Sequence, residues 1–119
     1  MSATTDDGFN RPGFVKLSPA AIALAREFIG VAGAQDRAAR IVTFEWTPSL
    51  MMREPGKPER DLGPCLLIGA YRRNEVPAAF IDMVGGLEVI TRIPDEAWPS
   101  GALRLIDIDE TRPFGVGLR

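Results

Sequence analysis

Residues 80–93, FIDMVGGLEVITRI, decide the fold class of this chain of 119 residues. Two runs rich in apolar and β-branched residues flank Gly85 and Gly86, and a glycine pair can adopt the positive φ angles of a two-residue hairpin turn. Pro94 follows the second run and ends it, because proline has no amide hydrogen to continue a strand ladder. The stretch therefore predicts a β-hairpin, and with it a sheet.

The segment before the hairpin contains the clearest helix signals. Ser18 suits the N-cap and Pro19 the first helical position, while Gly30 and Gly33 are expected to end the helix. The predicted helix covers about residues 19–31. Its apolar face consists of four residues at helical spacing: Ile22, Ala25, Phe28 and Ile29.

Further strands are predicted at residues 40–46, 65–71 and 103–109, where apolar residues alternate with polar ones or form short runs. Only one segment is long enough to be a helix, so repeated βαβ units are excluded. The predicted fold is mainly β with one N-terminal helix (α+β). We expect a flexible N-terminal tail at residues 1–13 and a single domain over residues 14–119.

Composition excludes most kinds of catalytic and metal site. The chain has no histidine, which removes imidazole bases and ligands, and its single cysteine, Cys65, excludes internal disulfides and four-cysteine zinc sites.

The formal net charge is −2 with scattered basic residues, so no nucleic-acid partner is expected. The longest strongly apolar run, residues 65–71, is too short to cross a membrane, so no membrane association is expected. A lone cysteine suits a reducing compartment, and we expect a cytoplasmic location of bacterial type.

Several stretches, in their order and spacing, resemble the HesB-like family of A-type iron–sulfur cluster carriers. They are VKLSPAAIALAREFI at residues 15–29, MVGGLEVITRIP at residues 83–94, PSGALRLIDI at residues 99–108 and RPFGVGLR at residues 112–119. The resemblance covers about residues 14–46 and 80–119. It implies a compact β-sandwich with the helix packed against it.

The chain departs from this family at the cluster ligands. Family members hold iron or a cluster with three cysteines, one after the first long strand and two in a C-terminal Cys-Gly-Cys. Here Thr47, Pro48 and Ser49 follow the strand, and the sequence ends at Arg119 without that motif. The resemblance therefore implies a non-enzymatic binding or assembly module that has lost its cluster ligands and has no cofactor. The alternative is an iron–sulfur cluster or metal-handling protein that uses Cys65 from two or more subunits.

The proline-rich segment at residues 47–64 is the main candidate for a binding surface. It contains four prolines and two glycines and shows no periodicity, which predicts a long loop that is either functional or disordered. Adjacent apolar residues in such a loop either fold back onto the core or contact a partner. We expect the loop to bind a protein partner or a second copy through Leu50, Met51, Met52, Arg53 and Lys57.

Three other groups have simpler structural interpretations. Cys65 begins an apolar run and is expected to be a buried strand residue. Asp107, Asp109 and Glu110 could hold a hard cation, but alternation favours the solvated face of an edge strand. The basic residues of the middle segment alternate with acidic ones and are expected to be solvated: Arg53, Lys57, Arg60, Arg72 and Arg73.

Overall fold

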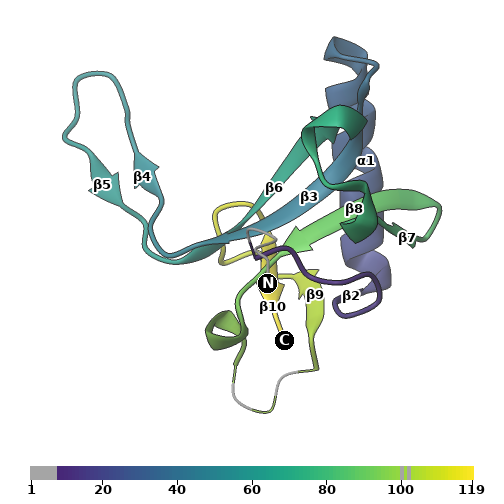
Figure 1. Ribbon diagram of the computed structural model, residues 1–119. Coiled ribbons are helices and arrows are strands. Elements are labelled where there is room, and N and C mark those ends of the chain that lie inside the picture. The colour runs from purple at the N-terminus through teal and green to yellow at the C-terminus, as the bar shows by residue number, and fades with distance from the viewer. Residues whose placement is uncertain (1–7, 100, 102) are drawn as a thin grey trace.

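The computed structural model describes residues 8–99, 101 and 103–119 (Figure 1). Its helix and strands are, in chain order, β2 (Lys16–Leu17), α1 (Pro19–Gln35), β3 (Ala39–Thr47), β4 (Met51–Met52), β5 (Arg60–Asp61), β6 (Cys65–Arg72), β7 (Asp82–Val84), β8 (Leu87–Arg92), β9 (Leu105–Ile108) and β10 (Val116–Leu118). Short 3₁₀ turns lie at Arg73–Glu75, Ala78–Phe80 and Asp95–Ala97. One helix combined with several strands confirms the predicted mainly β, α+β class. The HesB-like resemblance stays a prediction.

The predicted hairpin is present. β7 and β8 pair antiparallel with Val84 opposite Leu87, and Gly85 and Gly86 turn the chain with φ of 56° and 81°. A Cβ on Gly85 would also lie 2.9 Å from a methyl group of Ile22 on the helix. Glycine is therefore required at this position both by the backbone conformation and by the close approach of the helix.

The hairpin is part of a four-stranded sheet of order β6-β3-β8-β7. β8 runs parallel to β3, and β6 runs antiparallel to β3 on its other side. Because side chains alternate along a strand, Val42 and Phe44 of β3 lie on one face and Thr43 and Glu45 on the other. We call the face with Val42 the first face and the face with Thr43 the second face.

Helix α1 packs against the first face. As predicted, it begins at Ser18, whose hydroxyl accepts a hydrogen bond from the Ala21 amide at 3.1 Å. The predicted apolar face is only partly right, since the fully buried helix residues are Ala21 and Ala25, whereas Phe28 is only half-buried. These small side chains let the helix approach the sheet closely, over the core that contains Phe44.

The helix continues past its predicted end to Gln35, so the prediction that Gly30 and Gly33 terminate it is wrong. Nothing lies within 4 Å of the place where a Cβ would stand on either glycine. At such uncrowded positions glycine costs a helix only about 1 kcal/mol relative to alanine, which does not suffice to end it. The chain leaves the helix at Asp36, where the backbone becomes extended.

A second, three-stranded sheet of order β10-β9-β2 completes the core. β9 covers a shorter range than the predicted residues 103–109, and it is the central strand of this sheet. Its Ile106 and Val116 of β10 are fully buried in the cluster that contains Phe44. The two sheets and the helix therefore share one core.

Residues 8–13 lie within the predicted tail but have fixed partners. The Asn10 amide donates to the Thr91 carbonyl at 2.9 Å, and the Asn10 side chain both donates to the Ile93 carbonyl at 3.1 Å and accepts from the Ile93 amide at 2.9 Å. The Gly13 amide donates to the Asp82 carboxylate at 2.6 Å. This part of the predicted tail is thus held against β7 and β8. Residues 1–7, the rest of that prediction, lie outside the described residues.

Candidate functional site

The predicted loop at residues 47–64 forms a projecting hairpin. β4 and β5 pair antiparallel, with Met51 opposite Asp61 and Met52 opposite Arg60. The expectation that this segment has no regular structure is therefore wrong. The sequence shows no periodicity here because strands of two residues are too short to produce an alternating pattern. Figure 1 shows β4 and β5 standing away from the helix and from both larger sheets. We call residues 48–64 the arm.

The dimensions of the molecule agree with this projection. The Cα radius of gyration is 14.6 Å, whereas a compact chain of this length is expected to have about 13.5 Å. The arm connects β3 to β6 at Thr47 and Cys65, which are opposite each other in the sheet. The arm therefore leaves and rejoins the sheet at a single point.

The apolar residues of the arm are separate from the core. Leu50, Met51 and Met52 are not members of the hydrophobic cluster or of the residues packed around it, and Met51 is 48% exposed. Of the two expectations for these residues, folding back onto the core is thus wrong. Strand alternation places Met51 on one face of the arm and Leu50 and Met52 on the other, so the three do not form a single patch.

The charged residues of the arm are paired with one another. Arg53 lies 2.7 Å from Glu59, and Lys57 and Arg60 lie 3.1 Å and 3.6 Å from Glu54. All of these side chains are substantially exposed, so the pairs contribute little to stability. Arg53 and Lys57 therefore remain available to exchange their partners at an interface.

Cys65 lies at the position expected for a buried strand residue. It begins β6, it is 1% exposed, and burial raises the pKa of the thiol, although Arg112 opposes that shift. Burial thus keeps the sulfur in its protonated, weakly nucleophilic form. The alternative, an iron–sulfur cluster or metal held by Cys65 from two or more subunits, stays a prediction.

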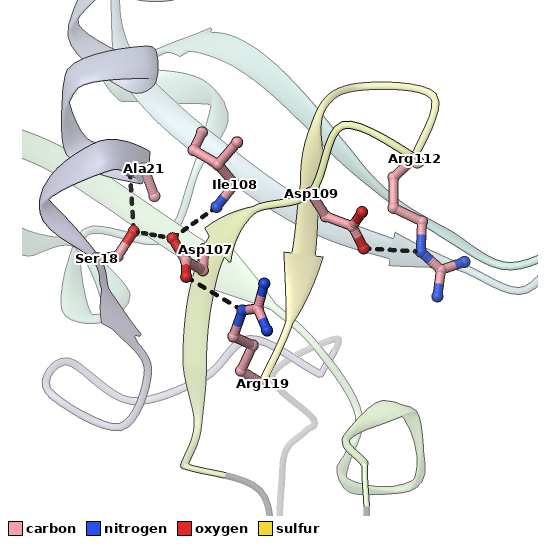
Figure 2. Close-up of polar contacts among 7 residues, drawn as sticks. All are labelled: Ser18, Ala21, Asp107, Ile108, Asp109, Arg112 and Arg119. Carbon is pink, nitrogen blue, oxygen red and sulfur yellow. Dashed lines mark hydrogen bonds and ion pairs between the residues drawn. The ribbon is translucent and has the colours of Figure 1, made fainter.

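The acidic residues of β9 are bound by groups of the protein itself (Figure 2). Asp107 accepts hydrogen bonds from the Ser18 hydroxyl at 2.6 Å and the Ile108 amide at 2.8 Å, and lies 3.1 Å from the Arg119 guanidinium. These contacts, led by the Ser18 hydroxyl, hold the pKa of Asp107 below its usual value. Asp107 therefore links the start of α1 to Arg119, the residue that follows β10.

Asp109 has a similar structural role at the turn that follows β9. Its carboxylate accepts from the Thr111 side chain and amide and lies 3.6 Å from Arg112, and these contacts lower its pKa. The prediction of an edge strand is wrong, because β9 has a neighbour on each side. Glu110 is exposed, and no group of three potential metal ligands is found among the described residues.

The basic residues of the middle segment are dispersed. Outside the arm, Arg72 lies 2.9 Å from Asp36 and Arg73 is paired with Glu88. These residues do not gather into one basic surface, which agrees with their expected solvated role.

Sequence reasoning missed a cavity on the second face of the four-stranded sheet. The cavity has a volume of about 170 Å³, and aromatic, aliphatic and charged side chains line it. Gly69, in the middle of β6, is its one local signal. Glycine within a strand often marks a place where something approaches closely, and a Cβ here would lie 2.9 Å from the Thr43 hydroxyl.

Comparison with known proteins adds no family assignment: no family model, curated protein or solved structure matches this chain. Among the described residues, no helix has the length and apolar character needed to cross a membrane.

Proposed function

We propose that this protein is a non-enzymatic binding and assembly module of HesB-like type, without cluster ligands, that associates through its arm with a protein partner or a second copy. The observation that carries the proposal is the position of Leu50, Met51 and Met52 on a projecting hairpin outside the hydrophobic core. Apolar side chains on both faces of a projecting hairpin can be buried together when a partner surrounds the hairpin. Methionine suits such a surface because its flexible side chain adapts to a partner.

The backbone of the arm supports the same proposal. A two-stranded hairpin is only marginally stable by itself in water. β4 and β5 pair only with each other among the described residues, so each has an outer edge that could accept another strand. Pairing with a strand of the partner would stabilise the arm and bury its methionines.

The prolines reduce the entropic cost of such binding. Each of the four prolines, Pro48, Pro55, Pro58 and Pro64, fixes its φ angle near −65°. A segment whose conformations are already restricted loses less entropy when it is ordered at an interface. We also propose a cytoplasmic location, because the single cysteine suits a reducing compartment.

The test is a triple substitution, Leu50→Ser, Met51→Ser and Met52→Ser. The matched control replaces three exposed apolar residues outside the arm, Val31→Ser, Met83→Ser and Leu103→Ser, which are 63%, 65% and 71% exposed. Sedimentation velocity of the purified protein measures self-association, and crosslinking in the native host measures partner binding. Urea denaturation measures stability. We expect the arm variant alone to lose association, with a change of at most about 1 kcal/mol in the unfolding free energy.

Two results would contradict the proposal. If the arm variant keeps its oligomeric state and every partner, the arm is a passive connector. If it unfolds or loses several kcal/mol, the three residues belong to a core, where each truncation costs about 2–5 kcal/mol.

A further inference from the structure

The second face of the four-stranded sheet contains a cavity that is independent of the arm. Register pairs Thr43 of β3 with Gly69 of β6 and with Ile90 of β8, so these three positions form one row across the face. Because Gly69 has no side chain, this row of side chains has a gap beside Thr43. The adjoining rows contribute Tyr71 on one side and the Glu45–Arg92 pair on the other.

The cover of the cavity comes from two segments distant in sequence. Phe9 of the N-terminal segment packs against Phe80, with ring centroids 5.9 Å apart, and the Arg92 guanidinium lies 5.5 Å from the centroid of the Phe9 ring. Val76, between the two 3₁₀ turns that precede β7, completes the wall. The cavity is therefore bounded by the sheet below and by held side chains above.

Its size restricts the ligand. The volume is about 170 Å³, well below the roughly 300–1,000 Å³ of sites for drug-sized ligands and cofactors. An engineered protein cavity of about 150 Å³ holds one benzene molecule. The space therefore suits a single group with about four to six heavy atoms in its apolar part.

Its charge restricts the ligand further. The charged residues that line the cavity are Glu45, Glu75 and Arg92, which together carry one net negative charge. Glu45 binds Arg92 through its Oε1 atom at 3.2 Å, and Glu75 accepts the Arg72 amide through its Oε1 atom at 2.7 Å. The second oxygen of each carboxylate can accept a hydrogen bond from a ligand. A cavity lined by two carboxylates and by the rings of Tyr71 and Phe9 favours a cation over an anion or a neutral group.

We propose that this cavity binds a primary ammonium group on a short alkyl chain. The carboxylates of Glu45 and Glu75 accept from the ammonium, while Tyr71, Val76 and Phe9 pack against the methylene groups. A free amine and a lysine side chain of a partner share this chemistry. Arg92 neutralises part of the charge and holds Glu45 in position.

The experiment titrates the intact, isotope-labelled protein at pH 7 and follows amide chemical shifts. The probes are n-butylammonium chloride, Nα-acetyl-lysine methylamide, neutral n-butanol and sodium butyrate. We expect butylammonium to shift the amides around Thr43, Tyr71 and Glu75, with butanol weaker by roughly fivefold or more and butyrate not binding. Equal binding of butanol, or no binding of butylammonium, would overturn the proposal.

Two variants locate the interaction. Glu75→Gln keeps an oxygen for the Arg72 amide but loses the charge, and it is expected to weaken butylammonium binding by roughly fivefold. Glu59→Gln, on the arm, is the matched control and is expected to change nothing. An unchanged affinity in Glu75→Gln would also overturn the proposal. Tighter binding of the lysine derivative than of butylammonium would identify a partner's lysine as the source, and binding of butylammonium alone would identify a free amine. None of these binding measurements depends on the arm, so this proposal and the proposed function can fail separately.

Discussion

Replacing the arm, residues 48–64, by an Asn-Gly turn is expected to leave the domain folded and no less stable. Thr47 and Cys65 are cross-strand partners, so a two-residue turn can join β3 directly to β6. Shortening a loop of about 17 residues to two reduces the entropic cost of loop closure by about 2 kcal/mol. The replacement also removes the exposed ion pairs and the short ladder of the arm, and this offsets part of the gain.

The expected unfolding free energy therefore lies between the value of the parent and roughly 2 kcal/mol above it, a rise in Tm of up to about 8 °C for a domain of this size. Calorimetry measures the Tm, and sedimentation velocity measures association. A variant in which a Gly/Ser loop of equal length replaces the arm is the control, and it should lose association without the gain in stability. A shortened variant that unfolds, or that melts many degrees below the parent, would refute the reasoning, because the arm would then be part of the cooperative core.

Four further outcomes are expected. Cys65→Ser should lower the unfolding free energy by about 1–3 kcal/mol, measured by urea denaturation, because it buries a hydroxyl in place of a thiol. A variant as stable as the parent that lost metal or partner binding would contradict the core role of Cys65. Ser18→Ala should cost about 1–2 kcal/mol, because it removes both the helix cap and the hydrogen bond that the hydroxyl donates to Asp107, and an unchanged urea midpoint would show that neither contact contributes. The pKa of Asp107 is lower in the folded than in the unfolded protein, so its contribution to stability is present above about pH 4 and is lost as the pH falls through the folded value. Urea midpoints measured below pH 4 should accordingly depend less on pH in Asp107→Asn than in the parent. Thermal melts with and without EDTA should coincide, whereas a loss of several degrees in the chelator would show that a metal stabilises the fold.

The features that could be predicted from the sequence depend on neighbouring residues. The β7–β8 turn follows from the positive φ that Gly85 and Gly86 can adopt, and the start of α1 follows from the side-chain cap at Ser18. Both signals act within a few residues, so they can be interpreted without knowledge of the rest of the fold. The predicted end of α1 is wrong because helical glycine is tolerated wherever no neighbour constrains it.

The features that could not be predicted depend on distant pairing. Asp107 looks like an exposed edge residue until β2 and β10 are placed on either side of β9. The cavity requires Gly69 to lie beside Thr43 and Phe9 to pack over the same face, and those contacts join segments far apart in the chain. The hairpin of the arm could not be predicted for a different reason, the lack of a local signal. Its strands are too short to produce a pattern, although the concentration of prolines correctly marks an unusual segment.

The two faces of the four-stranded sheet differ in what their residues are suited to do. The first face carries Val42, Phe44 and Val89, and they fill the core beneath the helix. The second face carries Thr43 and Glu45 beside the buried Ile41 and Ile90, at positions that apolar residues could also occupy on a covered sheet. Burying a hydroxyl and partly burying a carboxylate stabilise a fold less than apolar packing does. Polar residues at positions that apolar residues could fill are typical of binding sites, so this face is the one expected to bind a small ligand.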